Sequence, residues 1–467
     1  MRFRRTAPGS RREASTDGTA DYGKTASFLA IGVGLTGVIT YVYFFVAAHV
    51  LSKPDYGEIA VLWSAVFITV STLYRPVDQL LSRHISERLV KGEPIGEPVR
   101  VAIKIQLGLA ATFAVVTLAL HGPIADGLLE GNETLYWVFF SAVLFYAASY
   151  FARGYLAGHR RFGLFTALIL SESVFRTLFA VLVAVGLLSG QSAVAIGIVA
   201  APALSLMVVP AVFARRAKKV ATPPPEAPPD DASEFSMAHG SGFAASVLLI
   251  MFSEQVFLNA GPLIIRGLEG AAAAGFIFNV LMIARAPLQL FQAVSTSILP
   301  HLTSLHTSTA EGSEEELHQT VRMVLAAIVA FTAVAFVAFL IAGPQMMQLA
   351  FSDKFSYDRG GLLLVTAGMG LYLAAVTINQ ACLAQGQVRR ASARWIGCAA
   401  FFVAWCFLPF IADEFRRVEI GFALTAGLLL ALLYLIYRRP RERAEDVPQA
   451  GSTEELETRL AAVDEGA

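Results

Sequence analysis

Residues 214–238 read ARRAKKVATPPPEAPPDDASEFSMA, and this stretch divides the chain near its middle. It combines five prolines with a run of charges, so it cannot cross a membrane and is typical of a linker. Six apolar blocks precede it and six follow it. The sequence therefore predicts two halves of six membrane spans each, which is a common layout among secondary transporters.

The composition supports a membrane protein. The chain has 467 residues, of which 55% are hydrophobic and only 15% are charged, whereas soluble proteins carry about 25% charged residues. A helical span needs about 20 apolar residues, and twelve blocks qualify: 27–49, 58–81, 101–121, 134–157, 163–188, 191–213, 240–265, 271–299, 321–343, 360–385, 394–411 and 418–437. They are too long and too evenly apolar for barrel strands. Since the backbone must satisfy its own hydrogen bonds in lipid, we predict an all-α integral membrane protein with twelve transmembrane helices.

The loop charges predict the orientation, because cytoplasmic loops carry an excess of Lys and Arg. With a cytoplasmic N-terminus, 26 Lys and Arg residues fall on the inner side and 6 on the outer side. This bias predicts an even number of spans with both termini in the cytoplasm. The expected organisation is an N-terminal tail (1–26), six spans (27–213), a cytoplasmic linker (214–239), six spans (240–437) and a C-terminal tail (438–467).

Several classes of function are disfavoured by the sequence. The net charge is zero, which gives no signal for nucleic-acid binding. The cysteines Cys382, Cys398 and Cys406 lie in apolar runs without metal-ligand spacing, so we interpret them as small buried hydrophobic residues. HExxH, Walker A and GxSxG motifs are absent from the sequence. We therefore expect no enzyme activity, metal or cofactor. Transport would be driven by a gradient, by the membrane potential or by a partner ATPase.

The candidate functional residues are the polar ones inside the predicted spans. A charge in hydrocarbon costs about 2.5–3.5 kcal/mol on insertion scales, so it faces an interior or a water-filled cavity. The candidates are Arg75 and Asp78 in the second span, Glu172 and Arg176 in the fifth, Glu254 in the seventh, Arg285 in the eighth, and the pair Asn379–Gln380 in the tenth.

The spacing of these charges leaves two interpretations open. Glu172 and Arg176 are four residues apart, and Arg75 and Asp78 are three apart, so each pair shares a helix face. In the structural interpretation these are intrahelical ion pairs that lower the insertion cost, and Arg75 could also extend to the interface. In the functional interpretation they line a binding cavity.

Arg285 and Glu254 have no oppositely charged residue in their own spans. They lie in consecutive spans at similar depth and could form an interhelical pair. Three buried arginines favour an anionic ligand, because a guanidinium is always charged and offers a bidentate fork to phosphate. Three carboxylates balance the three arginines, which would let an arginine release a carboxylate and take a phosphate. Proton coupling through Glu254 or Glu172 is also compatible with this set.

An internal repeat is compatible with the sequence in two registers. One pairs Arg75-x-x-x-Gln79-Leu80 with Arg285-x-x-x-Gln289-Leu290. The other pairs Gly57 with Gly275 and moves the two arginines out of register.

Four motifs resemble those of a known family: AHVLSKPDYGE (48–58), RPVDQ (75–79) with Arg83, the run from Arg285-Ala286-Pro287 to Leu299-Pro300, and Gln385-Gly386 followed by Arg389-Arg390. Together with the 6+6 layout they are similar to Wzx-type flippases of the multidrug/oligosaccharidyl-lipid/polysaccharide exporter superfamily. The resemblance covers about residues 25–440. It departs from the family at His49, where an arginine is frequent.

The resemblance implies a MATE-like fold, in which two six-helix lobes rock around a central cavity by alternating access. The implied cargo is a polyprenyl-pyrophosphate-linked oligosaccharide, moved from the cytoplasmic to the outer leaflet of a bacterial cytoplasmic membrane. Arg75, Arg176 and Arg285 would hold the pyrophosphate, while Asn379 and Gln380 would contact cargo in the cavity. Asp78, Glu172 and Glu254 would serve in coupling or charge pairing. Membrane lipids, a polysaccharide polymerase and glycosyltransferases are the expected partners.

Other functions predict different features. A MATE-type ion-coupled drug antiporter should have an acidic cavity with few arginines. A non-transporting membrane subunit of a polysaccharide synthase should tolerate neutral substitutions at all the charged sites. A membrane glycosyltransferase would need an acidic catalytic site in a large loop, and the longest internal loops expected here are only about 25 residues.

Overall fold

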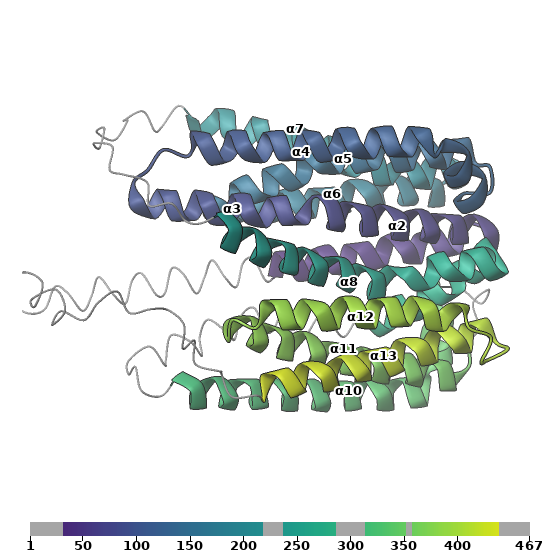
Figure 1. The fold of residues 1–467 in the computed structure, drawn as a ribbon. Coiled ribbons are helices and arrows are strands. Elements are labelled where there is room, and N and C mark those ends of the chain that lie inside the picture. Colours follow the sequence, from purple (N-terminus) through teal and green to yellow (C-terminus); the bar gives the residue numbers. More distant parts are fainter. Residues whose placement is uncertain (1–30, 218–236, 286–312, 352–356, 439–467) are drawn as a thin grey trace, which may run out of the picture.

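The computed structural model describes residues 31–217, 237–285, 313–351 and 357–438. Every regular element in these ranges is a helix, and the long helices lie side by side in an up-and-down bundle (Figure 1). The predicted tails, most of the predicted linker 214–239 and residues 286–299 of the predicted eighth span lie outside the described residues.

The N-terminal half begins with the helix Ile31–Val50. It continues with α2 (Lys53–Leu73), α3 (Arg75–Lys91), α4 (Gly96–Ala119), the short η1 (Pro123–Leu128), α5 (Glu133–Gly158), α6 (Phe162–Ala184) and α7 (Gly190–Ala217). The C-terminal half contains α8 (Met237–Glu269), the helix Ala271–Arg285, α10 (Ser313–Phe351), α11 (Arg359–Ala384), α12 (Val388–Phe407) and α13 (Glu414–Tyr437).

A helix lies in each of the twelve predicted blocks, and the all-α membrane class is confirmed. Among the described residues, ten helices are long and apolar enough to cross a membrane. The helix Ala271–Arg285 is apolar but shorter within its described part. The other exception is α12, whose first turns carry Arg389, Arg390 and Arg394.

The predicted second span, 58–81, lies within one continuous candidate membrane span, Lys53–Leu89, which is interrupted at a single residue. It consists of α2 and α3, which meet at Tyr74. The break follows from Pro76, which has no backbone N–H and restricts the conformation of the residue before it. The chain resumes its helical path at once, because the N–H of Asp78 donates to the Tyr74 carbonyl at 3.0 Å. Two candidate site residues, Arg75 and Asp78, therefore lie in the first turn after a break inside the bundle.

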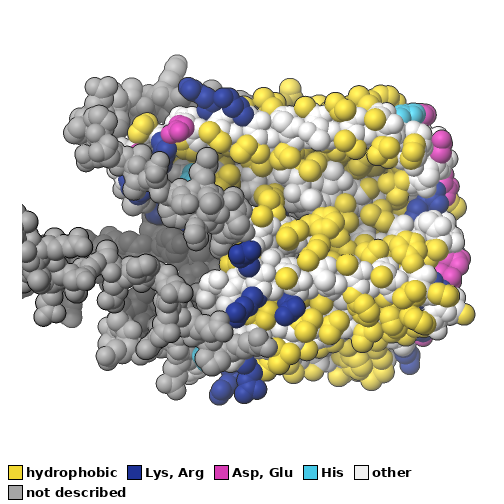
Figure 2. Space-filling view, in the orientation of Figure 1, with side chains coloured by type: hydrophobic (Ala, Val, Ile, Leu, Met, Phe, Trp, Pro, Cys, Tyr) yellow, Lys and Arg dark blue, Asp and Glu magenta, His cyan; other side chains and the backbone are white. Residues whose placement is uncertain are grey.

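The two ends of the bundle differ in charge. At one end, α2, α5, α11 and α13 begin, and their first turns are capped by Ser52, Asn132, Asp358 and Asp413. We call it the acidic end, because carboxylates near helix N-termini are favoured by the helix dipole. At the opposite, basic end, Lys and Arg side chains gather where α3 ends and α4 begins (Figure 2). Arginines also open α12 there, against the dipole preference, as expected if membrane topology decides their placement.

The two halves meet along α2, α8 and the helix Ala271–Arg285. α8 packs on α2 of the first half and on α12 of its own half. The closest approach involves two glycines: a Cβ on Gly275 would lie only 2.8 Å from the Cα of Gly57, and a Cβ on Gly57 would overlap the Ala271 carbonyl. Small residues at such a crossing allow close backbone packing in a membrane.

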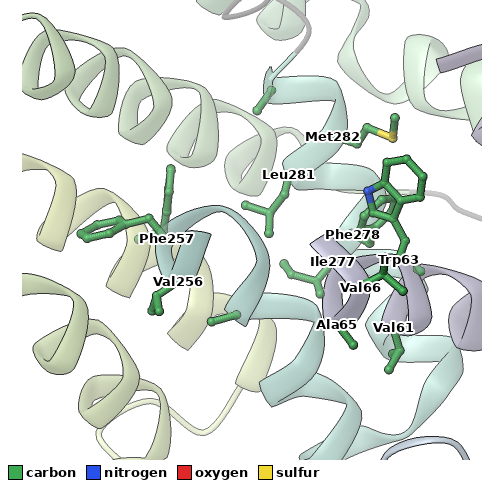
Figure 3. Packing of buried hydrophobic residues seen from close by; sticks show 14 of the residues in the cluster. Val61, Trp63, Ala65, Val66, Val256, Phe257, Ile277, Phe278, Leu281 and Met282 are labelled. Atoms are coloured by element: carbon green, nitrogen blue, oxygen red, sulfur yellow. The ribbon is translucent and has the colours of Figure 1, made fainter. Parts of the chain in front are cut away.

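Aromatic rings fill the interface beside these glycines. Phe44 of the first helix contacts both Trp63 of α2 and Phe278 of the second half, with ring centroids 5.1 and 4.7 Å apart. Figure 3 shows Trp63 directed toward Phe278 and Met282. The Tyr41 hydroxyl donates to the Met282 carbonyl at 2.5 Å. The interface between the halves is thus packed and largely apolar, and charged side chains that meet across it are exceptions.

Candidate interlobe binding site

Arg75 and Glu254 form an ion pair between the two halves. The Nη1 of Arg75, at the start of α3, lies 3.9 Å from the Oε2 of Glu254 in α8. The intrahelical pair between Arg75 and Asp78 that the spacing allowed does not form within 4 Å. The interhelical pair of Glu254 with Arg285 that the sequence allowed does not form within 4 Å among the described residues, and Glu254 faces Arg75 instead. Which partner each residue finds depends on where α3 begins after Tyr74 and on where α8 passes it.

Arg285 has no ion-pair partner among the described residues. It is the last described residue of its helix, and its Nε is buried without a hydrogen-bond acceptor in the described part of the chain. Tyr41 of the first half and Tyr372 of the second lie within electrostatic range of its guanidinium. Tyr372 is also within range of Arg75 and Glu254. These five side chains define what we call the interlobe cluster: Tyr41, Arg75, Glu254, Arg285 and Tyr372.

Arg153 is a buried residue that the sequence analysis missed. Its Nη2 donates to the Oε2 of Glu172, while the Ser149 hydroxyl donates to the other carboxylate oxygen. The intrahelical pair of Glu172 with Arg176, one of the two interpretations of their spacing, does not form, because Glu172 pairs with Arg153 of α5. In the sequence Arg153 resembles an inner-loop charge, because Arg160 and Arg161 follow it closely. The available signal was its position four residues before the end of an apolar block.

Arg176 is held by polar and aromatic neighbours of the first half instead of by a carboxylate. Its Nη2 donates to the Thr40 hydroxyl at 2.8 Å, and its guanidinium carbon lies 4.4 Å from the centre of the Trp63 ring. A cation over an indole face is stabilised by the ring quadrupole. The Arg176 Nε, like that of Arg285, has no hydrogen-bond partner within the described residues.

Asp78 connects the interlobe cluster to the buried charges of the first half. It lies within electrostatic range of both Arg75 and Arg153, although neither forms a direct ion pair with it in the described structure. Its backbone is close to Gly154, where a Cβ would meet the Asp78 carbonyl oxygen at 2.6 Å. A series of alternating charges therefore runs from Glu254 through Arg75, Asp78 and Arg153 to Glu172.

The adjacent amides Asn379 and Gln380 lie on different faces of α11. Asn379 is buried, and its Oδ1 accepts a hydrogen bond of 2.9 Å from the indole N–H of Trp395. Its oxygen is therefore already satisfied inside the second half. Gln380 is exposed on another face of α11. The structure brings neither amide into contact with Arg285.

A second ion pair joins the halves at the acidic end. Arg266, near the end of α8, donates to Glu130 at 3.1 Å. Glu130 follows η1 with φ of 54°, and Gly131 has φ of 75°, so two consecutive left-handed residues form this turn. Nearby, the Tyr56 hydroxyl of α2 donates to Asn279. No local pattern in the sequence indicates this contact, because it depends on how α8 meets the turn after η1.

No family model matches the chain, and no curated relative does. Solved structures do match. The chain superposes on a multidrug resistance MATE family transporter of the MOP superfamily in its inward-facing conformation with a TM-score of 0.65, covering 94% of this chain and 99% of that one at 10% identity. The chain has a MATE-type fold.

Two further MATE structures agree with this assignment. A MATE protein in the bent conformation matches with a TM-score of 0.59 and 13% identity, over 89% of this chain and 94% of that one. The eukaryotic MATE transporter AtDTX14 matches with a TM-score of 0.57 and 14% identity, over 90% and 95% of the two chains. At these identities the likeness establishes only the MATE-type all-α fold of this chain.

Proposed function

We propose that this MATE-type protein is a transporter that flips a polyprenyl-pyrophosphate-linked oligosaccharide from the cytoplasmic to the outer leaflet by alternating access. The observation that carries the proposal is Arg285, a buried guanidinium without a carboxylate partner among the described residues, placed where the two lobes meet. The sequence resemblance to Wzx-type flippases supports the same cargo.

The charge balance of the bundle interior favours an anion. At the acidic end, Glu58, Arg417 and Glu419 are also buried. Deeper in the described bundle, the charged residues are four arginines and three carboxylates: Arg75, Arg153, Arg176 and Arg285, with Asp78, Glu172 and Glu254. An uncompensated cation in a low-dielectric interior is costly. A phosphate supplies the missing negative charge and accepts the bidentate hydrogen bonds that a guanidinium offers.

The interlobe contacts fit a carrier that is closed at the acidic end. The glycine crossing, the Tyr56–Asn279 hydrogen bond and the Arg266–Glu130 ion pair all lie at the acidic end of the interface. The excess of Lys and Arg assigns the basic end to the cytoplasm. Cargo would therefore enter from the cytoplasmic side, consistent with the inward-facing conformation of the MATE transporter that matches the chain.

The direct test is translocation of a fluorescent lipid-linked oligosaccharide in proteoliposomes. Arg285→Ala and Arg176→Ala are expected to abolish translocation while the purified proteins remain monodisperse. Arg83→Ala is the matched control, because Arg83 is an exposed arginine of α3 that pairs with Glu87. Translocation at the wild-type rate by both variants would show that the buried arginines do not bind the cargo.

An ion-coupled drug antiporter is the second candidate, and the buried carboxylates favour it. Glu254 lies at the interface with its side chain 19% exposed, and Asp78 lies within electrostatic range of the same Arg75. This function predicts efflux of a cationic dye such as ethidium against a proton or sodium gradient. Glu254→Gln should abolish the efflux, and Arg285→Ala should not weaken it. The opposite pattern is expected for the flippase.

A further inference from the structure

We infer that Glu254 is a displaceable counter-ion: a diphosphate bound by Arg75 and Arg285 takes the place of the Glu254 carboxylate and replaces the ion pair that joins the two lobes. The inference rests on the proposed function and names a residue that regulates the same site. When the diphosphate of the cargo binds, it replaces Glu254 as the counter-ion of Arg75.

The geometry of the Arg75–Glu254 pair suits a contact that is meant to be exchanged. Its N–O separation of 3.9 Å is longer than the 3.1 Å of the other interlobe pair, Arg266–Glu130. The Arg75 side chain is 41% exposed, whereas the paired Arg153 is only 16% exposed. A half-exposed, loosely held guanidinium remains accessible to a ligand and contributes little to stability as an ion pair.

Arg285 provides the second arm of the site. Its guanidinium is buried and lacks a carboxylate partner among the described residues, and it shares the neighbour Tyr372 with Arg75 and Glu254. The two arginines belong to different lobes. A diphosphate has oxygens on two phosphorus atoms, so one ligand can accept hydrogen bonds from both guanidinium groups.

The net charge of the interlobe cluster determines whether the Glu254 carboxylate can stay beside a bound diphosphate. The interlobe cluster holds two arginines and one carboxylate, a net charge of about +1. The diphosphate of a lipid-linked sugar carries a charge of about −2, because both of its phosphates are diesters with one ionised oxygen each. Two arginines therefore balance the ligand, and an ionised Glu254 beside it would be repelled. The ligand and Glu254 compete for Arg75.

The exchange has a consequence for the lobes. Arg75–Glu254 lies about 18 Å from Arg266–Glu130 along α8, given twelve residues at 1.5 Å each. Loss of the first pair leaves the acidic-end contacts intact. The ligand then bridges the lobes at the site itself, and a ligand shifts a conformational equilibrium only through such differential contacts.

Binding of inorganic pyrophosphate to the full chain in detergent, measured by calorimetry, tests the inference without requiring transport. Glu254→Gln should bind pyrophosphate about fivefold more tightly, because Arg75 no longer has to leave a carboxylate. Arg285→Ala and Arg75→Ala should each weaken binding by about tenfold or more, the scale for losing a charge-assisted hydrogen bond. Glu87→Gln, which frees the exposed Arg83 of the same helix, is the control and should leave the affinity unchanged.

The outcomes separate this inference from the proposed function. Unchanged or weaker pyrophosphate binding by Glu254→Gln would overturn the counter-ion role even if the protein flips lipid-linked sugars. Absence of pyrophosphate binding by the wild-type protein would overturn it as well. Tighter binding by Glu254→Gln without any lipid flipping would support the counter-ion and refute the proposed cargo.

Discussion

At the scale of single residues, the Arg153–Glu172 pair shows how strongly burial shapes a charge. Glu172 is 4% exposed and has two donors, Arg153 and Ser149. Glu172→Gln leaves a buried guanidinium without a counter-charge, so we expect a loss of about 3–5 kcal/mol in the free energy of unfolding. The double variant Arg153→Met/Glu172→Leu should recover most of this loss. Unfolding in detergent, followed by circular dichroism, measures both.

The control for this prediction is Glu87→Gln. Glu87 pairs with Arg83, and the two side chains are 45% and 65% exposed. Its substitution should cost less than about 1 kcal/mol, the usual range for exposed pairs. Equal losses for Glu172→Gln and Glu87→Gln would contradict the importance of burial, and a double variant as unstable as Glu172→Gln would show that the site requires the charges themselves.

Sequence reasoning singled out Glu172 and Arg176, but it missed the buried Glu58, Arg417 and Glu419, and it assigned no buried charge its partner. Composition alone is enough to find a charge in an apolar block, as with Arg75, Glu254 and Arg285. A partner on another helix depends on how helices cross, which no local pattern encodes. The spacing in the sequence suggested Arg176 as the ion-pair partner of Glu172, whereas in the structure Glu172 pairs with Arg153. Arg153 itself was hidden by its nearness to the end of its block.

At the scale of elements, the break between α2 and α3 positions Arg75. Pro76 removes one N–H from the helical ladder, and the regular helix is interrupted where the candidate site begins. Pro76→Ala restores the donor, so we expect unchanged or higher thermal stability together with a loss of lipid translocation. Pro54→Ala is the matched control, since Pro54 lies in the first turn of α2, where proline is tolerated. Full translocation by Pro76→Ala would show that the interruption of the helix is dispensable.

The caps at the acidic end make a separate prediction about pH. Burial disfavours the ionised form of Asp358, but hydrogen bonds from Arg416 and from the Gly361 N–H outweigh it and lower its pKa. A lowered pKa means that Asp358 stabilises the fold at neutral pH and loses that contribution as pH falls through its pKa in the folded state. Asp358→Asn keeps the cap but loses the ion pair with Arg416.

Thermal unfolding at several pH values tests this role of Asp358. At pH 7, Asp358→Ala should be less stable than Asp358→Asn by about 1 kcal/mol, the usual contribution of a helix cap. The difference between wild type and Asp358→Asn should shrink toward acid pH. A difference that is constant with pH would mean that the charge of Asp358 contributes nothing to stability.

Elements were the most predictable level of the structure. Hydropathy places a helix in every predicted block, because lipid allows the backbone few alternatives. It did not predict the break at Tyr74, although Pro76 was visible in the sequence, because prolines are tolerated in membrane helices and need not divide them. Three arginines at the start of α12 made that helix the least apolar of the set.

At the scale of the whole molecule, the interface decides between the two repeat registers. Gly57 and Gly275 are each the fifth residue of their helix, counted from Lys53 and Ala271, and they touch across the interface. Equivalent residues meet in this way near the axis that relates two similar halves. The geometry therefore favours the register that pairs the glycines, and Arg75 and Arg285 reach the same site from non-equivalent positions.

The Arg266–Glu130 pair gives the final prediction, because it lies where the lobes must separate for cargo to leave at the acidic end. In a background without Cys382, Cys398 and Cys406, cysteines at positions 130 and 266 should react with a short bis-methanethiosulfonate cross-linker. A direct disulfide is not expected, since an Arg–Glu contact keeps the two Cα atoms too far apart. Cross-linking should stop lipid translocation, and reduction should restore it.

The matched control for this cross-link is a pair inside one lobe. Asp358 and Arg416 also form an ion pair, but both belong to the second half, on α11 and α13. Cysteines there should cross-link equally well without stopping translocation, because rigid-body rocking does not change distances within a lobe. A carrier that works at full rate with positions 130 and 266 joined would have to release cargo without opening the acidic end. Alternating access between these two lobes would then be wrong, whatever the cargo.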